Sequence, residues 1–522
     1  MSTTAPHHLF FEKYHLALLF ALLFFSLFIR LYDLSETPLG MHADEVSSAY
    51  NAYSILKTGR DEHGKFFPLY FEAFNDYKHP FLLYSMVPSL ALFDLTPFGT
   101  RIPSVIFSVF GIFFFYLILK NLFDKNVALL SAFLLSVMPW YFHYSRLGFE
   151  VMSFCFLFLL GIFLFFKGFQ NKNWWYASTL VLGISLYAYG VARLFVPLFI
   201  FGCLYIYRDL LFPQYKKTLL LCIFLFLIIA SPAYYASFFD EANARFSVVS
   251  IFNRSETPFA SFIINYISHF SAPYLFFRGD AQIVNGVTNW GELYHFSLFF
   301  LPFGLYYSWN HRKDKPIQLL LFWLLLYPLA ASFTYGDLPH SARSMIGVPV
   351  FSALTALGIL FFFSISTEKM EKYLFSERTK TLCHYLLFFL ITVIIICEMV
   401  FFFHTYFFTY KETSADHWLA FAKPTVTYME QIKPNFEHLY LSKTGLDLFY
   451  ISILYYTQAD PALYQKEGLA AFGYEFCDFE QCFNESQKNV YIFRGFEVSI
   501  NGTHNIYYHD SDRIAVKFFE TQ

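Results

Sequence analysis

Charged residues are scarce in this chain. Asp, Glu, Lys and Arg together make up 14% of its 522 residues, whereas a soluble domain carries about a quarter. Hydrophobic residues reach 57%, with 73 phenylalanines among them, and they gather in long apolar runs. This pattern excludes a soluble globular protein and predicts a polytopic membrane protein. The net charge of -3 offers no basic excess for binding nucleic acid.

Cysteines are also few. The seven present are too scattered for a disulfide framework or a zinc site. Cys477 and Cys482 are the exception, because they lie close together in the polar tail and can form a local disulfide if that tail is extracytoplasmic. Walker A, GxGxxG and HExxH motifs are missing, as is a GxSxG motif on a strand–turn–helix. No small-residue cleavage site follows the apolar segment 16–29, which we therefore predict to remain as a first span.

A helix that crosses a membrane needs roughly 20 apolar residues. Eleven segments are predicted to do so: 15–32, 98–119, 126–144, 149–167, 174–191, 194–211, 217–238, 293–309, 316–335, 344–366 and 382–406. Segment 81–95 is short, contains Pro88 and is predicted to stay at the interface. With this count of spans, five loops lie on the same side of the membrane as the N-terminus. Each of them contains at least two basic residues, as short cytoplasmic loops do. We therefore expect a cytoplasmic N-terminus and an extracytoplasmic C-terminus.

This topology brings ionisable residues at helix ends onto the extracytoplasmic face. Asp44 and Glu45 lie there in the first long polar loop, which ends at Lys78 and His79. The same face receives Arg146, Glu150, Arg193, His340 and Arg343. Each could serve only as a helix anchor, and the two acids suit the positive end of a helix over about 46–57. Their joint placement is better explained by a polar cleft.

The character of the sequence changes after about residue 409. Charges become frequent, strand-like runs appear at 438–441, 490–493, 506–508 and 514–519, and helical patterns lie between them at 418–433 and 446–457. We predict two domains, a transmembrane domain over 1–408 and a small mixed α/β domain over 409–522. The fold class is thus mainly α, a helical membrane bundle with a C-terminal α/β domain on the extracytoplasmic side.

Several stretches together resemble the GT-C membrane glycosyltransferases of glycosyltransferase family 39, which include the protein O-mannosyltransferases and aminoarabinose lipid A transferases. They are GMHADEVSSAYNAYSILKTGRDEHGK, DYKHPFLLY, FGTRIPSVIFSVFG, LLSAFLLSVMPWYFHYSRLGFEVMSFCFLFLLG and DLPHSARSMIGVPVFSALTALG. The resemblance covers roughly residues 15–365. His79 departs from it, since close relatives often have proline before Pro80.

The resemblance implies an inverting transfer of a sugar, a mannose-like hexose or an aminopentose, from a polyprenyl phosphate carrier in the bilayer to an acceptor hydroxyl on a protein, lipid or glycan. Asp44 matches the family's general base, and Glu45 is expected to orient the acceptor or hold the loop. The leaving phosphate needs positive charge, for which the candidates are Lys78, Arg146, Arg193 and Arg343, with His340 as a hydrogen-bond donor. Glu150 and His79 are expected to orient these groups. Some GT-C enzymes use a divalent cation near the acids, whereas others need none, so no metal ligands are assigned.

Two other classes remain open. A transporter or flippase of lipid-linked sugars would place polar groups or broken helices near the middle of the membrane, and the predicted spans hold few charges, with Glu398 as the main exception. A lipid-linked glycan polymerase or ligase shares the carrier chemistry, and the sequence separates it poorly from a transferase.

Overall fold

The chain divides into two compact units. The computed structural model describes residues 6–74, 76–239, 250–336, 338–373, 376–478, 482–483, 488–495, 504–509 and 511–521. The first unit comprises Met1–Tyr32, Ser104–Arg146 and Glu150–Thr405, and the second comprises Asp33–Pro103, Leu147–Phe149 and Tyr406–Gln522. The second unit therefore joins the segment after residue 409 with the first polar loop, which the sequence analysis had assigned to the other domain.

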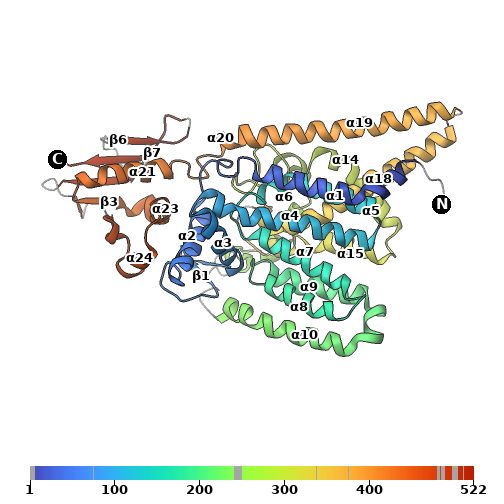
Figure 1. Ribbon diagram of the computed structural model, residues 1–522, viewed down its shortest axis with the longest axis horizontal. Helices are drawn as coiled ribbons and strands as arrows, with labels where there is room; N and C mark the ends of the chain where they lie inside the picture. The colour runs from blue at the N-terminus through green and yellow to red at the C-terminus, as the bar shows by residue number, and fades with distance from the viewer. Residues whose placement is uncertain are drawn as a thin grey trace. The chain divides into compact units, whose positions relative to one another are not determined.

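The first unit consists of helices in its described residues (Figure 1). The longer ones are α1 (Pro6–Leu31), α4 (Pro97–Leu122, which begins in the second unit), α5 (Lys125–Val137), α7 (Val151–Lys167), α8 (Asn173–Ser185), α9 (Ala192–Ile206), α10 (Arg208–Phe239), α13 (Pro258–Ser268), α14 (His295–Asn310), α15 (Lys315–Leu326), α18 (Val348–Tyr373) and α19 (Glu377–His404). Short helices connect them: α6 (Pro139–Tyr144), α12 (Ile251–Arg254), η2 (Pro273–Arg278), α16 (Leu329–Ser332), α17 (Ser341–Ser344) and η3 (Met345–Gly347).

Among the described residues, six helical segments are long and apolar enough to cross a membrane: Tyr14–Leu31, Pro97–Leu122, Arg208–Phe238, Lys315–Ser332, Ser341–Tyr373 and Glu377–Thr413. Four apolar helices of the same residues are shorter, among them Pro80–Phe93. At 1.5 Å per residue its 14 residues reach roughly 21 Å, less than the ~30 Å of a hydrocarbon core. The long apolar segments make the chain an integral membrane protein, as predicted. The count of eleven spans and their orientation stay predictions.

Glycine residues allow the helices α14 and α18 to pack closely. A Cβ atom on Gly304 of α14 would lie 2.0 Å from the Leu354 carbonyl oxygen, and one on Gly358 of α18 would lie 2.0 Å from the Phe300 carbonyl oxygen. Only glycine lets the two backbones approach so far, which is how membrane helices gain packing contacts where lipid offers no hydrophobic driving force. This pair forms part of the buried scaffold of the first unit.

The second unit begins with the first polar loop. It contains α2 (Ala43–Thr58), the antiparallel strands β1 (Phe71–Ala73) and β2 (Asp76–Lys78), and α3 (Pro80–Phe93). His42 caps the start of α2, where its ring nitrogen accepts the Asp44 N–H at 3.2 Å and its own N–H donates to Glu45 at 3.4 Å. Gly59 ends the helix with φ +70°, a conformation that glycine adopts without strain. The predicted helix start at the acid pair is confirmed.

The C-terminal part of the second unit is a mixed five-stranded sheet with strand order β4-β3-β5-β7-β6. Its strands are β3 (His438–Ser442), β4 (Tyr474–Cys477), β5 (Asn489–Arg494), β6 (His504–Tyr507) and β7 (Ile514–Glu520). The pairs β3–β4 and β3–β5 are parallel, whereas β5–β7 and β6–β7 are antiparallel. All four predicted strands are present, and the predicted mainly α fold with a small C-terminal α/β part is confirmed.

Two helices pack on this sheet, α21 (Ala422–Ile432) and α23 (Tyr450–Tyr456). The same part of the chain contains α24 (Pro461–Glu467) and the short elements η4 (Thr405–Tyr410), α20 (Lys411–Thr413), η5 (Lys433–Asn435), α22 (Lys443–Leu446), η6 (Asp447–Phe449) and η7 (Leu469–Phe472). Met429 of α21 and Ile453 of α23 pack with strand residues such as Ile492 in one apolar core, and Figure 1 shows α21 beside β7. The Cys477–Cys482 disulfide forms as predicted. Asn484 and Asn501, which match glycosylation patterns, lie outside the described residues.

The C-terminal helices also hold α2. Tyr50 donates its hydroxyl to the Ala459 carbonyl at 3.2 Å. The Gln465 side-chain amide donates to the Ser54 hydroxyl at 2.9 Å and to the Asp61 carbonyl at 2.9 Å. These bonds link positions some 400 residues apart in the sequence, so the helix that carries the acid pair depends on the C-terminal segment for its position.

Candidate functional site

Glu45 is fully buried at the start of α2. Its two carboxylate oxygens accept hydrogen bonds from Nε and Nη2 of Arg101, each at 3.1 Å, and Oε1 also accepts the Gly148 N–H at 2.7 Å. A carboxylate that is buried and bonded on both oxygens has little capacity left for a substrate proton. Of the two roles expected for Glu45, this geometry favours holding the loop.

Arg101 ties the first polar loop together from the start of α4. Besides Glu45, its guanidinium donates to the backbone carbonyls of Leu34 at 3.0 Å, Pro38 at 3.1 Å and Gly40 at 2.8 Å. Its planar fork is suited to such multiple contacts. Arg101 was not predicted as a site residue from the sequence, although a charge inside the predicted span 98–119 is a signal of a buried partner or a functional site.

Asp44 differs from its neighbour because its side chain is about half exposed. Oδ1 lies 2.7 Å from Nζ of Lys78, which ends β2, and Oδ2 lies 3.4 Å from Nδ1 of His42. The Lys78 ammonium, with a smaller contribution from His42, holds the pKa of Asp44 well below its usual range. The structure thus brings together one exposed, ionised carboxylate and one lysine, two residues that the sequence predicted for a site.

Glu62 is a second buried acid of this unit that the sequence analysis did not single out. Asn51 of α2 donates its side-chain amide to Oε1 at 3.0 Å and accepts the Glu62 N–H at 3.0 Å. Burial raises the pKa of Glu62 to about 8, against the opposing effects of the Asn51 hydrogen bond and the Lys78 charge. A protonated Glu62 at neutral pH leaves Asp44 as the ionised carboxylate beside Lys78.

All three predicted arginines lie in the first unit, and Arg146 and Arg193 contact backbone and hydroxyl groups there. Arg146 Nη1 donates to the backbone carbonyls of Ile29, Arg30 and Tyr32 at 3.2, 2.8 and 2.7 Å, where it satisfies carbonyls at the end of α1. Arg193, in the first turn of α9, donates to the Ser237 hydroxyl at 2.6 Å. Both guanidinium groups have structural contacts, and their role toward a phosphate stays a prediction.

His340 and Arg343 lie together around α17. Nδ1 of His340 lies 3.9 Å from Oδ2 of Asp280, and Arg343 donates to the Thr334 hydroxyl at 2.7 Å. Asp280 accepts the Ser341 N–H at 2.7 Å, while its own N–H donates to the buried carboxyl of Glu292 at 3.1 Å. Burial raises the pKa of Asp280, and it raises that of Glu292 further. This polar cluster was not predicted from the sequence.

The two residues assigned orienting roles lie in different units. His79 precedes α3 as its N-cap, with its ring 6.0 Å from that of Tyr70. Glu150 precedes α7, where its backbone carbonyl accepts the Ser153 hydroxyl at 2.6 Å. Among the described residues no group of three or more His, Cys, Asp or Glu is placed to hold a metal ion. The contacts of Glu45 also do not fit metal ligation, because both of its oxygens already accept hydrogen bonds.

Comparison with solved structures identifies the fold. The chain is similar to ArnT from Cupriavidus metallidurans in the apo state, with a TM-score of 0.55, 13% sequence identity and coverage of 97% of this chain and 98% of that one. The same protein bound to undecaprenyl phosphate gives a TM-score of 0.54 at 13% identity, covering 95% and 97%. The oligosaccharyltransferase AglB from Archaeoglobus fulgidus, in complex with an inhibitory peptide and a dolichol-phosphate, gives 0.53 at 13% identity, covering 93% and 70%. The chain therefore has the predicted GT-C fold.

Sequence comparison points the same way over part of the chain. The family model described as dolichyl-phosphate-mannose-protein mannosyltransferase matches residues 78–235. A search of curated protein sequences returned no significant match. The matched segment starts at Lys78 and includes Arg101 and Arg146, but it leaves out Asp44 and Glu45.

Proposed function

We propose that this GT-C chain is an inverting glycosyltransferase that moves a sugar from a polyprenyl phosphate carrier to an acceptor hydroxyl on the extracytoplasmic face. The fold, the matched family and the phosphate-bearing lipids bound by structurally similar proteins support this class. The observation that carries the proposal is the exposed Asp44 carboxylate 2.7 Å from Lys78, on a helix whose start is fixed by Glu45 and Arg101.

In the proposed reaction Asp44 is the general base. The acceptor hydroxyl gives its proton to the Asp44 carboxylate while its oxygen attacks the anomeric carbon of the donor. The bond between that carbon and the phosphate oxygen breaks, and the electron pair leaves with polyprenyl phosphate. Lys78 supplies the positive charge that the leaving phosphate needs as its negative charge grows.

Because of the ion pair between Asp44 and Lys78, the proton affinity of Asp44 depends on whether the donor is bound. While Lys78 contacts Asp44, it keeps the pKa of that carboxyl low and makes it a poor base. A donor phosphate that attracts the Lys78 ammonium weakens this contact, so the proton affinity of Asp44 rises when the donor is bound. The base is thus strengthened at the stage when it is needed.

The test is sugar transfer by the purified protein in liposomes, offered a panel of radiolabelled polyprenyl phosphate sugars. Asp44→Asn should abolish release of polyprenyl phosphate, because it removes the base with little change of volume. The matched control is Asp209→Asn. It breaks another Asp–Lys ion pair, in which Oδ1 of Asp209 lies 2.6 Å from Nζ of Lys315, and it should leave transfer unchanged.

Full activity of Asp44→Asn would refute the assignment of the base. No transfer with any donor, together with carrier-dependent movement of the lipid across the bilayer, would instead favour the flippase alternative. The donor that is consumed identifies the sugar, and the labelled product identifies the acceptor as a protein, lipid or glycan.

A further inference from the structure

His42, the N-cap of α2, is a second side chain in contact with Asp44. Its ring nitrogen Nδ1 accepts the Asp44 N–H at 3.2 Å and lies 3.4 Å from the Asp44 carboxylate oxygen Oδ2. The other carboxylate oxygen, Oδ1, lies 2.7 Å from the Lys78 ammonium. The carboxylate therefore has a cation at one oxygen and an imidazole nitrogen at the other, and the proposed reaction uses only the cation.

Two aromatic side chains hold the His42 ring in this position. The ring stands edge-to-face to Phe149, with the ring centroids 5.7 Å apart, and to Trp418, with the centroids 6.0 Å apart. Phe149 and Trp418 stack on one another at 5.9 Å, and Trp418 is fully buried. Edge-to-face pairs are a favoured arrangement of aromatic rings. The imidazole is therefore fixed by two segments of the second unit that lie far apart in the sequence.

The contacts of Nδ1 define the protonation state of His42. A ring nitrogen that accepts an N–H carries no proton of its own, so the neutral ring has its proton on Nε2. The side chain is 30% exposed, and Nε2 bonds to no described residue, so this proton can exchange with water. Nδ1 can instead take up a proton, and it then gives up the Asp44 N–H and donates toward Oδ2. The ring thus has an unprotonated nitrogen beside the carboxylate and a protonated one open to water.

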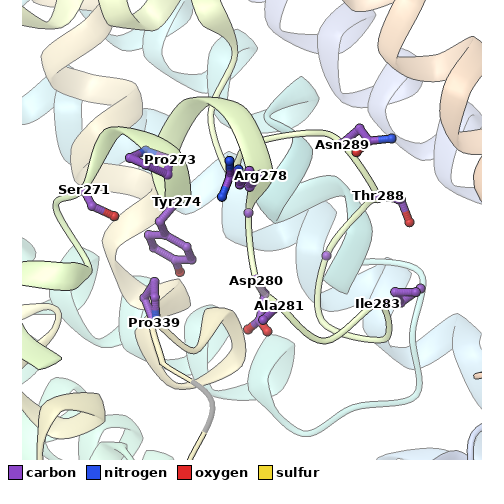
Figure 2. A pocket seen from close by; sticks show the side chains of 12 residues that line it. Ser271, Pro273, Tyr274, Arg278, Asp280, Ala281, Ile283, Thr288, Asn289 and Pro339 are labelled. Carbon is purple, nitrogen blue, oxygen red and sulfur yellow. The ribbon is translucent and has the colours of Figure 1, made fainter.

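Another histidine–aspartate pair, His340 with Asp280, borders a pocket of about 410 Å³ in the first unit. Figure 2 shows Asp280 among the side chains that line this pocket. Nδ1 of the histidine lies 3.9 Å from Oδ2 there, and both carboxylate oxygens accept backbone N–H groups. In the described part of the chain no backbone N–H donates to the Asp44 carboxylate. Of these two pairs, His42 with Asp44 is the one arranged for proton transfer.

The Lys78 ammonium favours the movement of a proton from Asp44 to His42. It is the main reason that the pKa of Asp44 lies well below its usual range, whereas an imidazole accepts protons near neutral pH. In the proposed reaction the donor phosphate attracts Lys78 while the acceptor hydroxyl loses its proton to Asp44. When polyprenyl phosphate leaves, Lys78 returns to Asp44 and lowers its proton affinity again. The carboxyl group therefore gives up its proton at the stage when the base has to be restored.

From these contacts we propose that His42 acts through Asp44 as a positioning residue, which orients the carboxylate and takes up its proton after each transfer. This role rests on the proposed function. The Asp44 O–H bond breaks and an N–H bond forms at Nδ1, which leaves an ionised carboxylate beside an imidazolium. The imidazolium then releases its Nε2 proton to water. Exchange with water moves the remaining proton from Nδ1 to Nε2, so both groups are restored for the next turnover.

The experiment measures sugar transfer and thermal unfolding of the full-length protein with two substitutions of His42. His42→Asn keeps an acceptor at the helix start, since asparagine is among the best N-cap residues, but it cannot take up a proton. It should unfold as wild type does and keep its KM for the donor, while kcat falls roughly a hundredfold, the lower end for a positioned proton-transfer group. His42→Ala should also lose kcat, and imidazole added to the buffer should restore part of it.

The matched control is His438→Asn. It removes another histidine beside a carboxylate, in which Nδ1 lies 3.6 Å from Oε1 of Glu475, and it should transfer sugar as wild type does. Imidazole should leave the kcat of this control and of His42→Asn unchanged, because neither substitution opens the space between Phe149 and Trp418.

Wild-type kcat in His42→Asn would overturn the proposal, because capping of α2 would then explain His42 completely. A kcat of His42→Ala that imidazole does not raise would overturn it as well. Asp44→Asn in the same assay separates this failure from that of the proposed function. An inactive Asp44→Asn beside a fully active His42→Asn refutes only the role of His42, whereas a fully active Asp44→Asn refutes the base and the role of His42 with it.

A second measurement does not depend on transfer. It is the nitrogen NMR spectrum of the protein labelled at its histidines, in nanodiscs, where the His42 signal is the one that His42→Asn removes. A neutral ring with its proton on Nε2 supports the proposal. A neutral ring with its proton on Nδ1 overturns it, even if no tested donor gives transfer, because Nδ1 then cannot accept a proton from Asp44.

Discussion

Glu45→Gln is expected to destabilise the second unit by about 3–5 kcal/mol, the usual cost of removing one partner from a buried ion pair. The substitution keeps the shape of the side chain but turns one of its two acceptors into an amide that faces Arg101 or Gly148, both of which donate to Glu45. The guanidinium then lies buried with its charge uncompensated. Because Glu45 also accepts the His42 N–H, the start of α2 should loosen and carry Asp44 with it.

The assay follows thermal unfolding of the purified protein in detergent alongside sugar transfer. Glu45→Gln should lower the unfolding temperature and lose activity over the same temperature range, whereas Asp44→Asn should lose activity with little change in unfolding. Glu45→Met, Arg101→Met and the double variant Glu45→Met/Arg101→Met form a cycle, in which the double variant should lose less stability than the two single losses added.

A Glu45→Gln protein that unfolds as wild type but transfers no sugar would refute the structural role and return Glu45 to the chemistry. Additive losses in the cycle would show that the two side chains do not stabilise one another. The cycle can be read without knowing the donor sugar, because unfolding is measured independently of transfer.

The other predictions concern charge and pH. Because the folded chain holds a proton on Glu62 up to about pH 8, stability should fall as pH rises from about 4.5 to 8, by roughly 5 kcal/mol at most. Glu62→Gln should flatten that slope in unfolding scans at pH 5, 7 and 9, and an unchanged slope would contradict the assignment. Lys78→Gln removes the main cause of the low Asp44 pKa, so the acid limb of the pH–rate profile should move to higher pH while the donor KM rises. Arg343→Ala should raise the KM for the donor several-fold and leave that for the acceptor nearly unchanged, and equal changes in both would count against a donor contact.

Local patterns in the sequence were enough to predict many of the helices and strands. Apolar runs predicted the membrane helices, the acids after His42 predicted the start of α2, and strand-like runs predicted the strands β3, β5, β6 and β7. Periodicity and capping act over a few residues, so they can be recognised without a fold. β4 was missed because it is a short strand of four residues with one buried position.

The roles of the acids were decided by tertiary structure. Asp44 and Glu45 are adjacent and chemically alike, yet one is exposed beside Lys78 and the other is buried against Arg101, which lies 56 residues away. The raised pKa of Glu62 likewise requires burial in the folded second unit. Burial and the position of a distant partner set the charge of a carboxyl group, and neither is written in the few residues around it. The sequence therefore determined which residues are candidates, whereas packing determined which of the two adjacent carboxylates is buried and which is exposed.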